Sequence, residues 1–315
     1  MSEVVMAPVP LAVERKRRSA FVDILVRLVR EKPWGFFGAI VTVVLLLTGI
    51  FANFLAPYGF NDVHAADFLQ PPSAKYLLGT DNLGRDEFSR IIYGARISVI
   101  VGLSATSLSI FIAMLIGVLS GYLGGTVDVL IQRFVDAWMC FPSLVLLIAA
   151  VSLTGPGMVQ LVVMLGVLYG IASSRILRGA VMGIKRNIYI DAAKSVGCSN
   201  IKIMIRHILP NIMAPIIVIF TTQIAAVILS EASLSFLGLG IPPPAPSWGG
   251  MLSGNGRTYM LLAPWLALWP GLALTVVVYG INMFGDALRD LLDPRLRGGV
   301  GRYESRVARA KLKRA

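Results

Sequence analysis

The charged residues between positions 189 and 211 are the first candidates for chemistry, because they interrupt a mostly apolar chain. The segment reads YIDAAKSVGCSNIKIMIRHILPN, and its charged or titratable side chains are Asp191, Lys194, Lys202, Arg206 and His207. No serine or cysteine stands in a recognisable nucleophile elbow here, and two histidines and two cysteines in the whole chain leave no clustered set of metal ligands. Binding is the chemistry that these residues favour.

The sequence also lacks a phosphate-binding loop. It contains no Gly-Lys pair, so the pattern Gly-x4-Gly-Lys-Ser/Thr cannot occur. We therefore expect no catalytic residue, no metal site and no cofactor in this chain.

Two short helices are expected to position the segment. Residues 189–196 suit a helix that Gly197 ends, and Ser199 or Asn200 can cap a second one. The apolar residues of the second helix fall on one side at helical spacing, and Pro210 is expected to end it. These apolar residues are Ile201, Met204, Ile205 and Ile208, with Lys202 and Arg206 opposite.

Two interpretations of this amphipathic pair stay open on periodicity. It could lie on a lipid surface, or it could bind another protein. Ala192 and Ala193 beside Asp191 leave a small, nearly flat patch that lipid does not require and that permits close approach of another backbone.

Composition places the chain in a membrane. Hydrophobic residues make up 56% of 315, only 15% are charged, and the mean hydropathy is +0.74, whereas a soluble domain is about a quarter charged. A first spanning helix at 35–56 is too long for a signal peptide. Six stretches are long and apolar enough to span: about 36–56, 98–120, 130–153, 159–178, 212–234 and 263–285.

Lysine and arginine positions predict the orientation. One side receives seven in 1–34, seven in 175–211, nine in 286–315 and Arg133, which is 24 of the 29. Both termini are therefore expected in the cytoplasm, which agrees with an even number of spans. The basic residues behind the net charge of +12 then set the membrane topology and contact anionic lipid, and no nucleic-acid partner is expected.

Two outer segments have more order than a linker requires. In the segment 57–96, Asp86 can cap a helix whose apolar face is Phe88, Ile91, Ile92 and Ala95. The turn-forming residues before it are Gly79, Asp81, Asn82 and Gly84, and Arg85 follows them. The segment that ends in this helix could be an interfacial helix resting on the membrane, or an outer docking or gating element.

The second outer segment reads LSFLGLGIPPPAPSWGGML. Its prolines, Pro243 among them, favour a stiff polyproline conformation, and Trp248 can anchor at the lipid headgroups. Glu231 lies just before it, and it could reach water, belong to the transport pathway or lock helices together.

With these residues in place, the pattern Asp191-Ala192-Ala193, Gly197 and His207-Ile208-Leu209-Pro210 resembles the EAA loop of permease subunits of bacterial ATP-binding-cassette importers. Asp191 stands where Glu is usual. The stretches 77–98, 121–144, 231–252 and 288–298 are similar to the second permease of the dipeptide, oligopeptide and nickel branch.

The resemblance implies an all-α integral membrane protein of the type I importer class, with six transmembrane helices and short cytoplasmic coupling helices. Its parts would be a cytoplasmic segment 1–34, a first helix 35–56, an extracytoplasmic segment 57–96, a core 97–286 with a coupling loop 187–210, and a basic tail 287–315. It would lie in a bacterial inner membrane, in contact with lipid.

The implied partners are a homologous second permease, two ATPase subunits that bind ATP and Mg, and an extracytoplasmic substrate-binding protein. The ATPase would contact Asp191, Ala192, Ala193, Gly197, Ile201, Ile205, His207 and Pro210. The binding protein would dock on, or a gate would form from, Gly79, Asp81, Gly84, Arg85, Asp86, Pro243 and Trp248. Substrate-binding residues stay unknown.

Other classes of membrane protein are weighed against this one. A secondary transporter or channel would normally show ionisable residues at mid-membrane or two matching halves. Spans two to six hold few such groups, mainly Gln223, Glu231 and Asn282, and no half-to-half repeat is visible. A membrane scaffold protein without transport activity would not explain why the segment 189–211 is ordered.

Overall fold

The molecule is a bundle of membrane-length helices. The structure, a computed structural model, describes residues 20–292, so the predicted regions before and after these limits lie outside it. Five helical runs are long and apolar enough to span: α2 (Pro33–Ile50), α4 (Glu87–Leu123), α7 (Met158–Lys185), the run Asn200–Phe236 and α12 (Trp265–Leu292). The pair α5 (Gly125–Met139) and α6 (Ser143–Thr154) supplies a sixth, broken span. The prediction of an all-α protein with six spans is confirmed.

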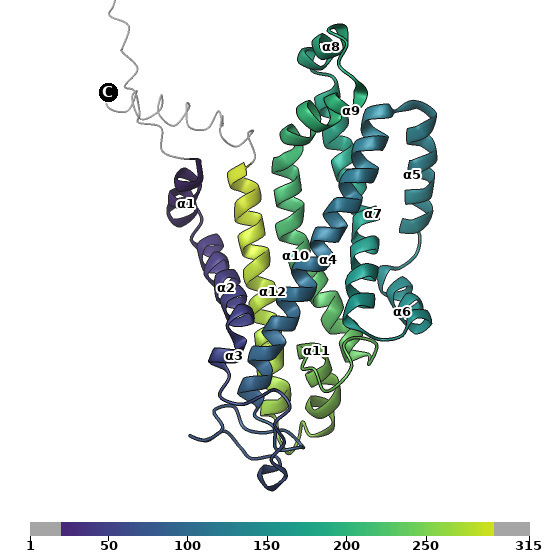
Figure 1. Ribbon diagram of the computed structural model, residues 1–315. Helices are drawn as coiled ribbons and strands as arrows, with labels where there is room; N and C mark the ends of the chain where they lie inside the picture. The colour runs from purple at the N-terminus through teal and green to yellow at the C-terminus, as the bar shows by residue number, and fades with distance from the viewer. Residues whose placement is uncertain (1–19, 293–315) are drawn as a thin grey trace, which may run out of the picture.

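Figure 1 shows how the spans are arranged, with α4 crossing the bundle beside α7, α10 (Met213–Phe236) and α12. The short helices α8 (Ile188–Ser195) and α9 (Asn200–Ile203) project at one end. The segment between α3 (Ala52–Leu55) and α4 lies at the other end, together with α11 (Trp248–Met251). Both ends of the described chain lie on the α8 side, as an even number of spans requires.

Small residues bring α4 and α7 into close contact. They recur every fourth position, so each set lies on one helix face. The α4 members are Ala105, Ser109, Ala113, Gly117 and Gly121, and the α7 members are Gly166, Gly170 and Ser174. A Cβ on Gly117 would lie 2.7 Å from the Ser174 carbonyl oxygen, and one on Gly170 would lie 2.9 Å from that of Ser109. Such small-residue faces are the usual means of packing helices tightly in lipid.

The helix α4 is longer than predicted. Asp86 caps it as expected, accepting from the Ser89 backbone N–H at 2.8 Å, but the predicted interfacial helix and the span 98–120 are one continuous helix. No proline interrupts residues 87–123, so nothing ends the helix between its outer cap and the membrane.

The third span differs from the predicted straight helix 130–153. The axes of α5 and α6 meet at 85°. Pro142 stands at the break with φ −58° and ψ 126°, which is extended backbone. Proline has no N–H for the helical ladder, and this explains the break.

The first span is also divided and is preceded by a helix. The predicted helix 35–56 corresponds to α2 and α3, which meet at Phe51, and α1 (Ala20–Glu31) lies ahead of them. Lys32, between α1 and α2, pairs with Asp290 of α12 at 2.5 Å. This ion pair and the packing of Leu28 against Ala287 and Leu291 attach the N-terminal helices to the last span.

Candidate functional site

The segment at the α8 end has the local structure that the sequence predicts for its first half. The helix α8 stops before Gly197, whose φ is +80°. The Ser199 hydroxyl then accepts from the Lys202 backbone N–H at 3.4 Å and caps α9. The predicted helix, glycine stop and serine cap are confirmed.

Pro210 does not end the second helix, so that prediction is wrong. From α9 the chain continues through a π-helical turn (Met204–Ile208) and a 3-10 turn (Leu209–Ile212) into α10. The Leu209 N–H donates to the Met204 carbonyl, five residues back, and this altered ladder accommodates the missing proline N–H. The loop is therefore joined to the fifth span by unbroken helical structure.

The same π turn splits the predicted apolar stripe. Ile201, Met204, Ile205 and Ile208 were expected on one face, but Ile208 is buried while Ile201 is 65% and Ile205 62% exposed. Hydrogen bonds to the fifth residue rotate the helix face relative to a regular α-helix. The buried face is instead Ile190, Ile203, Ile208 and Ile212, packed with Leu177 and Val181 of α7 and with Tyr122 of α4.

The outward face of the loop is a separate apolar surface. We call the surface formed by Ile188, Val196, Ile201 and Ile205 the apolar tip, and these side chains are 87%, 83%, 65% and 62% exposed. They belong to or adjoin α8 and α9, which project at one end of the molecule (Figure 1). The tip thus combines exposed apolar side chains with a rigid, buried base.

The other predicted coupling residues surround this tip. Asp191 is exposed and pairs with Lys194 of the same helix at 3.1 Å. Ala192 and Pro210 are exposed, whereas Ala193 and His207 are half-buried. A bond from the Tyr122 hydroxyl to Asn200 Oδ1, at 2.8 Å, ties the loop to the end of α4.

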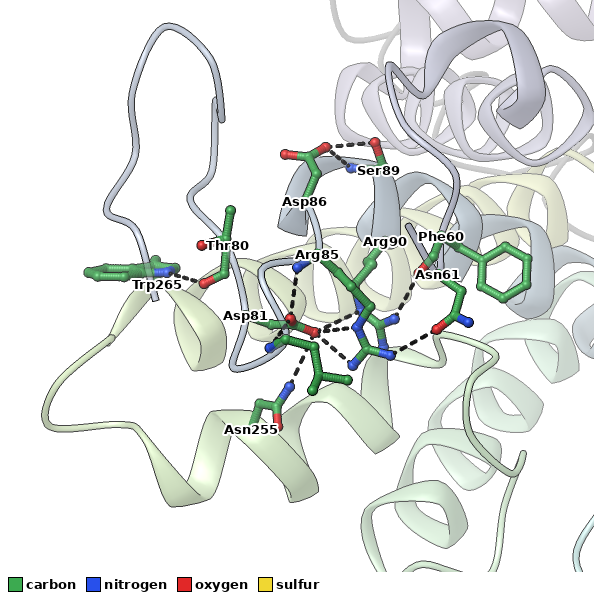
Figure 2. Close-up of polar contacts among 11 residues, drawn as sticks. Phe60, Asn61, Thr80, Asp81, Arg85, Asp86, Ser89, Arg90, Asn255 and Trp265 are labelled. Carbon is green, nitrogen blue, oxygen red and sulfur yellow. Dashed lines mark hydrogen bonds and ion pairs between the residues drawn. The ribbon is translucent and has the colours of Figure 1, made fainter. Parts of the chain in front are cut away.

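Asp81 is the centre of a polar cluster at the opposite end of the molecule, drawn in Figure 2. Its side chain is fully buried. One carboxylate oxygen accepts from the backbone N–H groups of Leu83 (2.8 Å) and Arg85 (3.0 Å). The other accepts from Arg85 Nε at 2.7 Å, and Arg90 Nε lies 3.8 Å from it. A single carboxylate therefore faces two largely buried arginines.

The cluster joins segments that are far apart in the sequence, as Figure 2 shows. Arg90 donates to the Phe60 carbonyl at 2.9 Å, and Asn255 Nδ2 donates to Asp81 at 3.3 Å. Trp265 at the start of α12 donates to the Thr80 carbonyl at 3.3 Å. The outer segment 57–96 thus meets the stretch 255–265 at Asp81 and Thr80, and we call this assembly around Asp81 the outer cap.

The predicted glycines fit closely inside the outer cap. Gly79 and Gly84 have φ of +83° and +71°. A Cβ on Gly84 would lie 1.9 Å from the His64 carbonyl oxygen. Nearby, the Tyr76 hydroxyl donates to Asp67 at 2.6 Å, and this bond, with Lys75 at 2.9 Å, lowers the pKa of Asp67.

The second outer segment differs from expectation in three respects. Residues 241–246 form bends and a turn around Pro243, not an extended polyproline stretch, and Ile241 at their start belongs to a buried apolar cluster. Trp248 is 2% exposed and donates to the Ile91 carbonyl at 3.1 Å, so it is no headgroup anchor. Glu231 is 1% exposed and accepts from Ser235 at 2.6 Å, so it does not reach water.

An ion pair between α5 and α7 was not predicted from the sequence. Arg178 Nε and Nη2 donate to the two oxygens of Asp128 at 2.6 and 2.5 Å, and Ser120 of α4 also bonds Asp128. Arg175 pairs with Asp136 one turn away. The available signal was two acids near the start of the predicted third span, Asp128 and Asp136, and two arginines, Arg175 and Arg178, near the end of the fourth.

Breaking this pair should loosen α5. We expect Asp128→Asn and Arg178→Gln each to lower the stability of the purified protein by roughly 1.5–3 kcal/mol, as for charged hydrogen bonds elsewhere. The double exchange Asp128→Arg with Arg178→Asp should recover part of the loss. Thermal unfolding in detergent measures this, with the exposed Arg133→Gln as control; a double exchange no more stable than the single variants would show that the pair is not what holds α5.

No candidate metal site emerges from the described residues. Between residues 20 and 292, no group of three or more His, Cys, Asp or Glu side chains is placed to hold a metal ion. The arrangement has an exposed apolar tip at one end and a polar cap at the other, connected by the spanning helices.

Comparison with known proteins agrees with this arrangement. Residues 113–298 match the family described as binding-protein-dependent transport system inner membrane component, and residues 19–72 match the N-terminal TM domain of oligopeptide transport permease C. The dipeptide transport system permease protein DppC of Alkalihalophilus pseudofirmus is 40% identical, over 85% of this chain and 88% of that protein.

Two further relatives carry related names. The di/tripeptide transport system permease protein DppC of Pseudomonas aeruginosa is 39% identical, over 84% of this chain and 88% of its own length. The glutathione transport system permease protein GsiD of Pectobacterium atrosepticum is 37% identical, over 93% and 97%. The chain therefore belongs to the family of inner membrane components of binding-protein-dependent transport systems, and it is a multi-pass transport permease.

Proposed function

We propose that this chain forms half of the translocation pathway of an ATP-driven importer of peptides or a related small solute. It would pair with a homologous second permease, and two separate ATPase subunits would bind the ATP and Mg. An extracytoplasmic binding protein would deliver the solute. The names of the relatives, which include dipeptide, di/tripeptide and glutathione permeases, support a peptide-type substrate.

The proposed orientation puts the apolar tip in the cytoplasm of the bacterial cell and the outer cap outside the inner membrane. The positive charge on the α8 side supports it: Arg175, Arg178, Lys185, Arg186 and Lys202 all lie near that end. Both chain termini would then be cytoplasmic. The chain itself would contribute no catalytic group, and its role would be to open and close the pathway.

The observation that best supports this proposal is the exposed apolar tip together with the buried residues beneath it. Exposed Ile188, Val196, Ile201 and Ile205 form a surface suited to a groove in another protein. Their backbone is anchored through Ile190, Ile203 and Tyr122 to α4 and α7, and it runs directly into α10. A displacement of the tip must therefore move spanning helices, because packed helices move as rigid bodies.

The mechanism follows from differential binding. ATP would bring the two ATPase subunits together, carry both tips inward and favour the outward-open arrangement, in which the loaded binding protein fits the outer cap. Hydrolysis would reverse the movement. Each ligand shifts the equilibrium only by its difference in affinity for the two states.

Replacing the loop tests the docking assignment. We expect the intact chain to co-purify ATPase subunits from detergent, and a variant with 189–208 exchanged for a Gly/Ser linker to lose them. A narrower variant exchanges Ile188, Ile201 and Ile205 for serine, leaves the buried face intact, and should also lose the ATPase subunits. Unchanged co-purification with the linker variant would contradict the assignment.

A further inference from the structure

The break in the third span, residues 140–142, lies inside the membrane. These residues belong to neither α5 nor α6, whose axes meet there at 85°. The ends of both helices line one hollow together with Leu168, Tyr169 and Ala172, which lie near the middle of α7. Because α7 spans the membrane, the break lies close to the middle of the bilayer.

The backbone at the break is not covered by the rest of the described chain. Cys140, Phe141 and Pro142 are all exposed. Pro142 is the N-cap of α6 and has no side-chain acceptor, so the first N–H groups of α6 lack partners within the helix. Backbone that is not helical is tolerated at this depth only where protein covers it or where it lines a water-filled cavity. Lipid alone does not satisfy it.

A second feature of the same face also excludes lipid. Asp136 lies one turn before the break and forms an ion pair with Arg175 of α7, three residues beyond Ala172. The Asp136 and Arg175 side chains are 42% and 41% exposed. Ionisable side chains within membrane spans face the interior of a bundle or a water-filled cavity, because hydrocarbon does not solvate them. This partly exposed ion pair therefore needs water or another protein beside it.

Water suits this face better than close protein packing does. Moving both charges from water into a protein interface carries a desolvation penalty that their attraction often does not offset. The break also borders a hollow of about 260 Å³, whose wall includes Trp138, Phe141 and Tyr169. The Tyr169 hydroxyl is bonded to that of Ser230 at 2.8 Å. Aromatic side chains beside a few polar groups are typical of surfaces that bind small molecules.

We propose that the break and the facing part of α7 line the water-filled translocation pathway at mid-membrane. The solute passes over Phe141 and Tyr169, and the Asp136–Arg175 pair lies on the α8 side of them. The inference rests on the proposed function and deepens it, because it names the face of this chain that the pathway uses. The opposite side of the bundle, at α2, faces lipid.

Cys140 is a native probe of this assignment, because it lies in the break. Thiols react as thiolates, which form in water and are disfavoured in apolar surroundings. The variant Cys198→Ser keeps Cys140 as the only cysteine of this chain. The assembled transporter in lipid nanodiscs is treated with a charged, membrane-impermeant methanethiosulfonate. Mass spectrometry of this chain follows the modification with and without ATP and binding protein.

The control places the only cysteine at Val43, near the middle of α2, in a chain that carries Cys140→Ser and Cys198→Ser. Val43 is exposed, and α2 and α5 lie on opposite sides of the bundle (Figure 1). We expect position 140 to react at least tenfold faster than position 43, at a rate that changes with ATP and binding protein. The treatment should also lower solute uptake more than fivefold when the cysteine is at position 140, and should not lower it when the cysteine is at position 43.

Equal, slow reaction at both positions in every condition overturns the inference, because lipid or protein then covers the break. Rapid reaction at position 140 without loss of uptake also overturns it, because the solute then passes elsewhere. Failure of the proposed function gives a different result. In that case position 140 reacts rapidly, but the assembly does not hydrolyse ATP in response to binding protein.

Discussion

Replacing Asp81 with asparagine is expected to prevent the outer cap from forming. The substitution leaves Arg85 and Arg90 largely buried without their shared counter-ion, and it weakens the bond from Asn255. Removing one partner of a buried ion pair costs about 3–5 kcal/mol, a large share of the stability of most domains. We expect the variant to insert into the membrane but to lose its ordered outer segments.

Limited proteolysis from the outer side measures this directly. Cleavage within 57–86 should become rapid in Asp81→Asn and stay slow in the wild type. Asp62→Asn is the matched control, because Asp62 is exposed and compensates no arginine. Equal protection of Asp81→Asn and the wild type would show that the cap does not depend on this carboxylate.

The outer cap shows what sequence alone can and cannot predict. The turn residues, the Asp86 cap and the approximate positions of the spans are local features, and local rules predicted them. The meeting of Asp81 with Asn255, 174 positions away, depends on how the spans pack. Trp248 was misread for the same reason: a tryptophan near a membrane end suits a headgroup, but here its indole finds the Ile91 carbonyl inside the protein.

Replacing Gly197 with valine is expected to abolish the stimulation of ATP hydrolysis by binding protein and solute. Gly197 has φ of +80°, and a Cβ there would meet nothing within 4 Å, so the penalty is purely conformational. A left-handed backbone costs a side-chain-bearing residue roughly 1–2 kcal/mol, and valine tolerates it poorly. The bend between α8 and α9 should open, displacing Ile188 and Val196 relative to Ile201.

Gly197→Asn supplies the control. Asparagine is similar in size to valine but visits the left-handed region far more readily. We expect ATPase activity stimulated by binding protein and solute to fall more than tenfold with valine, and less than threefold with asparagine. Similar activities for the two variants would mean that the shape of the bend is not what transmits the movement.

The predicted coupling loop, 187–210, shows the same limit of sequence-based prediction. The helix, its glycine stop and its serine cap followed from residue types at known positions. The division into a buried and an exposed face did not, because it depends on the π turn at Met204–Ile208, and that turn leaves no periodic signal in the sequence. Asp128 and Arg178 were missed because they are 50 positions apart and only the packing of α5 against α7 unites them.

Site-specific crosslinking at the apolar tip tests the central claim most directly. A single cysteine at Ile201, with Cys140 and Cys198 replaced by serine, is treated with a short thiol-to-amine crosslinker in native membranes. The control places the cysteine at Leu153, which is 89% exposed in α6, away from the tip. We predict that position 201 crosslinks to a separate ATPase subunit, in a manner that changes with bound nucleotide, and that position 153 does not. Labelling of position 201 by membrane-embedded lipid probes, with no crosslink to any ATPase, would contradict the account.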